Sequence, residues 1–175
     1  MRTRAPWLGA LAAALCLTAA PAAFGQAVVG GFAQANVVTP GSIVPLNGLR
    51  FGQFIRPVAA GTMTIDIAGA ATATGGVVAG YTIVQTGTGR GPATFALTGR
   101  PNRQCDVILP VLAVLTSGVQ TMTVTNFTAN TNGGGKIRLD ASGFAQLIVG
   151  GRLNVAANQA VGNYTGSYIL TVAFQ

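Results

Sequence analysis

The chain has 175 residues, of which 50% are hydrophobic and 7% are charged, and its formal net charge is +7. Its only acidic residues are three aspartates (Asp66, Asp106 and Asp140), and it has no histidine. This composition excludes a catalytic triad, a histidine- or glutamate-based acid/base pair and a metal-ligand cluster. We therefore expect no enzymatic activity, no metal and no cofactor.

Residues 1–27 have the pattern of a secretory signal peptide. A basic start at Met1–Arg4 is followed by an apolar run at Trp7–Ala20 and by small residues up to Ala27, which is the usual order of a cleaved export signal. The apolar run is too short for a membrane anchor, so we do not expect an integral membrane protein. The segment predicts export through the inner membrane to the periplasm and then to the cell surface or the extracellular space.

Residues 28–40 form an uncharged segment that reads as an extended strand ending at Pro40. Because alternate residues of a strand share a face, one face would carry Val29, Gly31, Ala33, Ala35 and Val37. The opposite face includes Phe32 and Val38. Such a segment is either the first strand of its own sheet or a donor strand lent to a neighbouring molecule, and Pro40-Gly41 would be the hinge.

Residues 41–175 predict one all-β domain. Short alternating stretches are separated by turn residues such as Asn132–Gly135, which is typical of an immunoglobulin-like β-sandwich. We expect strands at about 48–56, 61–68, 78–86, 92–98, 104–109, 112–117, 120–128, 136–140, 143–149 and 164–174. Leu153–Ala160 is the one stretch that is compatible with a helical turn.

Cys105 is the only cysteine that follows the signal segment. It has the same parity as Val107 and Leu109, so a buried thiol in a core strand is the simplest interpretation. The alternatives are an intermolecular disulfide or a reactive thiol. Without a histidine partner, the usual activation of a cysteine nucleophile is absent.

Three arginines, Arg90, Arg100 and Arg103, lie close together in the sequence. They form a candidate ligand patch for nucleic acid, anionic glycans or a membrane surface, or else a solvated positive face. No aromatic residue stands between Arg100 and Arg103 to stack on bases, so we expect no nucleic-acid partner.

The last fourteen residues predict a strand with an aromatic, apolar face. Residues of one parity are apolar or glycine throughout this tail, and they are Gly162, Tyr164, Gly166, Tyr168, Leu170, Val172 and Phe174. An unpaired apolar edge invites association, so this strand must be paired with something.

Three ordered fragments carry a family resemblance. They are Leu49–Phe54, then Phe95–Gly99 leading to Ile108–Pro110, and finally Leu147–Val155 followed by Tyr164–Tyr168. Together they resemble family 4402 of the bacterial domains of unknown function, which is secreted and pilin-like. The tail is similar to that of chaperone–usher fimbrial subunits, in which a glycine precedes alternating apolar residues and a penultimate aromatic residue. The disulfide common in many pilins is missing.

The resemblance implies an incomplete sandwich whose groove accepts a strand from the next subunit. The donor face would be Val29, Gly31, Ala33, Ala35 and Val37, and the acceptor groove would be lined by Gly162, Tyr164, Tyr168, Leu170, Val172 and Phe174. The expected function is a structural subunit of a bacterial surface filament. Its expected partners are other copies or related subunits, with a periplasmic chaperone and an outer-membrane usher. The alternative is a complete, monomeric sandwich that binds a surface ligand such as a glycan.

Overall fold

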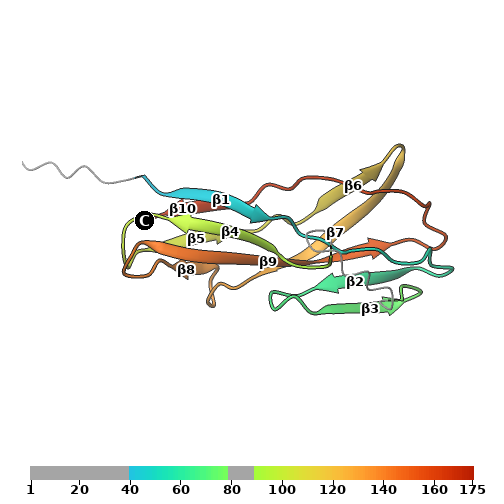
Figure 1. Ribbon diagram of the computed structural model, residues 1–175, viewed down its shortest axis with the longest axis horizontal. Helices are drawn as coiled ribbons and strands as arrows, with labels where there is room; N and C mark the ends of the chain where they lie inside the picture. Colours follow the sequence, from blue (N-terminus) through green and yellow to red (C-terminus); the bar gives the residue numbers. More distant parts are fainter. Residues whose placement is uncertain (1–39, 79–88) are drawn as a thin grey trace, which may run out of the picture. The chain divides into compact units, whose positions relative to one another are not determined.

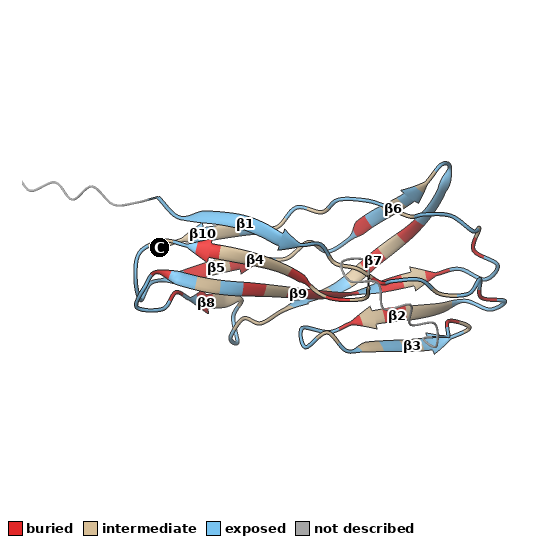
Figure 2. Ribbon diagram, in the orientation of Figure 1, coloured by how far each residue is buried: buried red, intermediate tan, exposed pale blue. Residues whose placement is uncertain are grey.

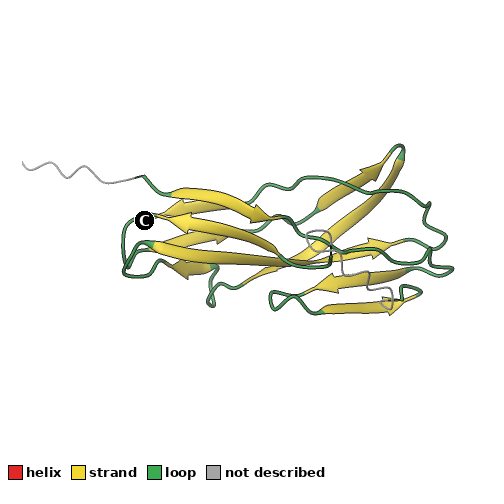
Figure 3. Cartoon of the chain, in the orientation of Figure 1, coloured by secondary structure: helices red, strands yellow, loops and turns green. Residues whose placement is uncertain are grey.

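A computed structural model describes residues 40–78 and 89–175, which belong to one compact unit. This part of the chain consists of strands and loops without a helix (Figures 1 and 3). The strands are β1 (Ser42–Asn47), β2 (Gly61–Ile65), β3 (Ala71–Gly75), β4 (Ala93–Thr98), β5 (Gln104–Ile108), β6 (Ala113–Ser117), β7 (Gln120–Ala129), β8 (Lys136–Arg138), β9 (Phe144–Val155) and β10 (Thr171–Phe174). They form two antiparallel sheets, which confirms the predicted all-β sandwich.

The larger sheet is organised around β9, its longest strand. The first half of β9 pairs with β4 and the second half with β2, while β7 pairs with Val149–Asn154 along the other edge. Strand β1 extends the sheet beyond β4, β3 extends it beyond β2, and β6 pairs with β7. At Gly150 a Cβ atom would collide with the backbone oxygen of Ile65. Glycine therefore permits the close approach of neighbouring backbones where β9 changes partner.

The smaller sheet has the order β10-β5-β8. Phe174 lies opposite Cys105, and Cys105 lies opposite Ile137. Since these residues share one face of the sheet, they turn an apolar row toward the interior. Cys105 is fully buried, as the parity of its strand predicted. Burial raises the pKa of its thiol, and the neighbouring Asp106 carboxylate raises it further, so the neutral thiol is favoured.

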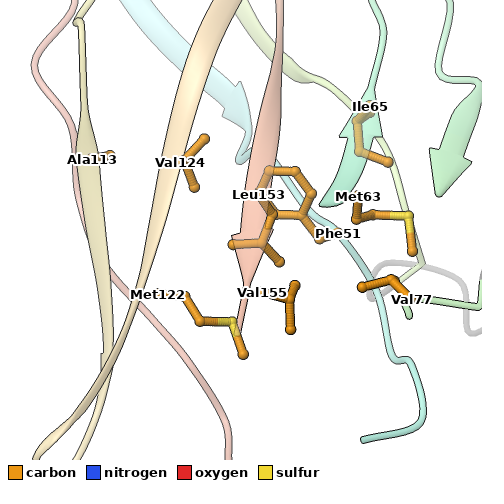
Figure 4. Packing of buried hydrophobic residues seen from close by; sticks show 9 residues of the cluster. All are labelled: Phe51, Met63, Ile65, Val77, Ala113, Met122, Val124, Leu153 and Val155. Carbon is orange, nitrogen blue, oxygen red and sulfur yellow. The ribbon is translucent and has the colours of Figure 1, made fainter. Parts of the chain in front are cut away.

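The core consists of two buried clusters, and β9 supplies both. Leu153 and Val155 pack with Met63, Ile65 and other residues of the first cluster (Figure 4). The second cluster includes Leu147 and Val149 from β9 with Cys105, Leu97 and Leu139. Figure 2 shows buried residues concentrated along β9 and the strands beside it. A strand with neighbours on both edges thus carries much of the packing.

Several predicted boundaries were wrong. The first strand is β1 at Ser42–Asn47, and 48–56 is irregular apart from a bridge between Arg50 and Gly91. Leu153–Val155 is the end of β9 and not a helical turn, because β2 and β7 pair with it on both sides. β3, which pairs with β2, was missed. The strand predicted at 78–86 lies almost wholly outside the described residues.

Candidate functional site

The tail does not form the single long strand that was predicted. Thr165 and Thr116 exchange two backbone hydrogen bonds, with N–O distances of 3.0 and 2.8 Å, which ties the start of the tail to β6. The end of the tail, β10, pairs with β5 in the other sheet. Gly166–Leu170 therefore crosses from one sheet to the other. At Gly166 a Cβ atom would collide with the backbone oxygen of Val114, so the crossing begins where only glycine fits.

An apolar groove of about 500 Å³ lies beneath this crossing. One wall is the crossing itself, and the other is the face of β1 that carries Ile43, Pro45 and Asn47. Most of the remaining lining residues are apolar, and they are Leu49, Phe51, Phe95, Ala113, Leu115, Val124 and Phe127. The groove is therefore an opening into the sandwich interior between β1 and the tail.

Strand β1 is exposed along its whole length, as Figure 2 shows. Ile43 is 37% exposed, Val44 51% and Leu46 53%, so neither face of the strand is covered. Within residues 40–78 and 89–175, β1 pairs only with β4, and side-chain hydrogen bonds join Ser42 with Thr98 (2.7 Å) and Asn47 with Thr94 (2.9 Å). Its other edge has no strand partner among the described residues, and such edges are where an additional strand pairs.

The alternation predicted for the tail is present in the structure. Tyr164, Tyr168, Leu170, Val172 and Phe174 are each half-buried, while the residues between them are exposed. Tyr168 reaches both core clusters and packs against Phe127 with ring centroids 5.2 Å apart. Burial raises the pKa of its hydroxyl.

The predicted groove residues divide into two sets. Tyr168 and Leu170 line the groove. Val172 and Phe174 pack against the second cluster, and Tyr164 donates a hydrogen bond to the Ala160 carbonyl (2.8 Å). Gly162 lies against Ser117. The predicted donor residues Val29, Gly31, Ala33, Ala35 and Val37 lie outside the described residues.

Sequence reasoning missed the opposite wall and the floor of the groove. Ile43 and Pro45 were not singled out, although a proline within a short apolar stretch is a signal of an edge strand. Phe95 and Phe127 come from separate strands, β4 and β7, and no local pattern shows that they meet here.

The three arginines of the candidate patch occupy different places. Arg90 precedes β4 and donates hydrogen bonds to the backbone oxygens of Phe51 (3.1 Å) and Gln53 (3.0 Å). Arg100 and Arg103 follow the other end of β4, so this extended strand separates Arg90 from them. Arg103 instead shares a polar hollow of about 290 Å³ with Arg138, a residue that was not predicted.

Beside that hollow, the outer face of the smaller sheet carries an ion pair. The Nζ of Lys136 lies 2.5 Å from an oxygen of Asp106. The hydrogen bond from Lys136 and a second one from Gln175 lower the pKa of the Asp106 carboxyl. Both side chains of the ion pair are more than a third exposed, so solvent weakens its contribution to stability.

Residues 40–78 and 89–175 contain neither a helix long and apolar enough to cross a membrane nor a group of three potential metal ligands. The features that define the class of protein are thus an antiparallel β-sandwich and an apolar groove between an edge strand and the tail.

The chain belongs to the family described as "Domain of unknown function (DUF4402)", whose model matches residues 41–174. This match confirms the resemblance to family 4402 drawn from the sequence, while the likeness of the tail to fimbrial subunits stays a prediction. No curated protein and no solved structure matches the chain.

Proposed function

We propose that this protein is the structural subunit of a bacterial surface filament, in which residues 28–40 of one copy fill the groove of the next. The observation that carries the proposal is the uncovered strand β1 beside an apolar groove of about 500 Å³. Apolar groups exposed in this way gain stability when they are removed from water. A strand with alternating side chains supplies backbone hydrogen bonds and apolar contacts together.

The chemistry of residues 28–40 suits this groove. The segment is uncharged and alternates small apolar residues with bulkier ones, so it enters an apolar space without burying a charge. A donor passed from one copy to the next makes a head-to-tail contact, and such a contact propagates as a filament. The proposal includes export by residues 1–27 and protection of the groove before assembly by a periplasmic chaperone, with an usher at the outer membrane.

Thermal unfolding of two chains tests this proposal. One chain is residues 41–175, and the other carries residues 28–40 after Gln175 through a short flexible linker. We expect the appended segment to raise the unfolding midpoint, Tm, by much more than the roughly 2–8 °C that one kcal/mol contributes. Equal midpoints would contradict strand addition.

Charged variants of the appended segment provide the matched control. Replacing Val29, Ala33 and Val37 by aspartate charges one face of the donor, whereas Phe32→Asp charges the other. The face that enters the groove is the one whose charging abolishes the gain in Tm, because an unpaired carboxylate is costly to bury.

The second candidate function is a complete, monomeric domain that binds an acidic glycan. The observation in its favour is the hollow shared by Arg103 and Arg138, which is also lined by Asn102, Gln104 and Gln175. Guanidinium groups suit carboxylates and sulfates. A monomeric mature protein that binds acidic oligosaccharides, together with an appended strand that leaves Tm unchanged, would favour this candidate.

A further inference from the structure

The domain has two ends that differ in chemistry. At the first, which we call the proximal end, the tail finishes and β1 begins. At this proximal end Gly41 lies against the ring of Phe174, and Arg103 donates a hydrogen bond to the backbone oxygen of Gln175 (3.2 Å). The turn before Phe144 also lies here, because the backbone N–H of Asn102 bonds to the carbonyl of Asp140 (2.9 Å). Gly41, which follows the donor segment in the chain, and the end of β10 therefore both lie at the proximal end.

The second, distal end consists of three loops that are joined to one another by hydrogen bonds. The N–H of Asn158 donates to the carbonyl of Pro57 (2.8 Å), and Arg56 donates to the carbonyl of Asn158 (3.0 Å). The side chain of Gln159 donates to the carbonyl of Thr121 (3.2 Å), which joins the same loop to the β6–β7 turn. Gly162 lies against Ser117 at this turn.

Each of the three distal loops presents a valine to solvent. Val119 is 92% exposed, Val161 86% and Val58 84%. Val119 follows Gly118, whose φ of 59° marks the turn between β6 and β7. Turn positions favour Gly, Asn, Asp, Pro or Ser, so this valine contributes nothing to the turn. Single exposed apolar residues are ordinary, but several on adjoining loops indicate a contact surface.

The direction of the donor strand decides which end of the next copy meets these valines. If the donor ran parallel to the tail, it would end at the proximal end and place the neighbour there. That is where the acceptor's own residues 28–39 must leave for another partner, so two copies would compete for one end. A donor that runs antiparallel to the tail places the neighbour at the distal end, and each copy then has one partner at each end.

We propose that the distal valines Val58, Val119 and Val161 are a docking surface for the proximal end of the next copy. This inference rests on the proposed filament function and adds a second contact to the donor strand. The proximal end offers Phe144, which is 41% exposed, as an apolar counterpart. The second contact fixes the angle between successive copies, which the strand alone leaves free at the Pro40-Gly41 hinge.

Assembly of the full mature chain tests the surface. The double variant Val119→Asp/Val161→Asp is compared with Val111→Asp, a matched control that lies between β5 and β6 and is 90% exposed in the native chain. We expect the distal variant to raise the protein concentration needed for assembly roughly tenfold or more, while the control assembles normally. Normal assembly of the distal variant would overturn the docking surface.

The gain in Tm from the appended strand is measured separately. The filament proposal and the docking surface are thereby tested independently. The distal substitutions are also made in the chain that carries residues 28–40 after Gln175, where the gain in Tm must persist. If that gain is absent in the native background as well, the filament proposal fails and the docking surface fails with it. If the gain persists and assembly is unchanged, only the docking surface is wrong.

Disulfide cross-linking tests directly which ends of two neighbouring copies face each other. Copies with Val119→Cys are mixed with copies with Ser142→Cys, since Ser142 is exposed in the proximal turn. A disulfide between the two kinds of copy is the expected product. A disulfide between two Ser142→Cys copies would show proximal ends facing each other and would contradict the antiparallel donor.

Discussion

Strands β9 and β1 belong to the same sheet, but within the described residues they differ in their surroundings: β9 is paired on both edges and has buried side chains, and β1 is paired on one edge and is exposed. β9 has partners on both edges and buries Leu147, Val149, Leu153 and Val155. In the described part of the chain β1 pairs only with β4, and each of its residues is exposed. The sandwich is therefore closed around β9 and open beside β1. On the open side, apolar side chains of β1 remain in contact with water.

Hydrogen exchange should show the largest difference between the two strands. Amides in the centre of β9 are expected to exchange only through global unfolding, whose cost is typically about 5–15 kcal/mol, whereas those of β1 open locally at much lower cost. Mass spectrometry or NMR on the mature monomer measures both. Appending residues 28–40 after Gln175 should slow exchange in β1 while β9 stays the same. Equal protection of the two strands in the monomer would remove the distinction.

Truncation of one leucine in each region should give the next largest effect. Leu147→Ala removes a fully buried side chain of the second core cluster and should destabilise the domain by about 2–5 kcal/mol. Leu46→Ala removes a side chain that is 53% exposed and should change stability by less than about 0.5 kcal/mol. Chemical denaturation measures both values. A large loss for Leu46→Ala would show that β1 is covered in solution.

A glycine pair compares the same regions at the backbone. Gly150→Ala places a Cβ atom against the backbone oxygen of Ile65, and overpacking of this kind costs about 1–3 kcal/mol. Gly48→Ala, next to β1, meets no atom within 4 Å and should be neutral or slightly stabilising. The change in unfolding midpoint at fixed m-value reports each effect. If both substitutions were neutral, β9 would not be tightly packed where it changes partner.

Acid should have a smaller effect on stability, through the turn between β8 and β9. The Ser142 hydroxyl (2.6 Å) and the Phe144 N–H (2.9 Å) donate hydrogen bonds to the Asp140 carboxylate and hold its pKa below the ordinary value. Because the folded pKa is the lower one, this stabilisation is complete above the unfolded value of about 3.9 and is lost as the pH falls through the folded pKa.

The Tm difference between the native chain and Asp140→Asn should accordingly be largest at neutral pH and shrink on acidification. Ser142→Ala removes the hydrogen bond that lowers the pKa of Asp140 most. This variant should therefore differ from the native chain in Tm with the same pH dependence, but by less than Asp140→Asn. Melting curves from neutral pH down to about pH 2 measure this. A difference that stays constant over the range would exclude Asp140 as the source of the pH dependence.

Much of the fold follows from local pattern. Alternation of apolar residues identified the strand character of most of the sheet and the buried side of the tail from Tyr164 to Phe174. It also placed Cys105 in the core. These features depend on the two-residue period of a strand, which is visible wherever one face is buried. The family resemblance, likewise carried by fragments of the sequence, was confirmed by the match over residues 41–174.

The groove could be predicted only in part. Tyr168 and Leu170 were recognised from the tail, but Ile43 and Pro45 were not, because β1 is exposed on both faces and shows no alternation. Boundaries failed for a related reason. β9 continues through Leu153–Val155 because β2 and β7 pair with it, and no single stretch of sequence contains that information.

The sequence by itself thus determined the all-β class and the inward side of the tail. Only the tertiary structure decided that the tail crosses between sheets, that β1 stands open beside it, and that Arg90 is separated from Arg103. The physical reason is the range of the interactions. Side-chain periodicity can be recognised within a few consecutive residues. Strand pairing, by contrast, joins residues far apart in the chain and leaves no local sequence pattern.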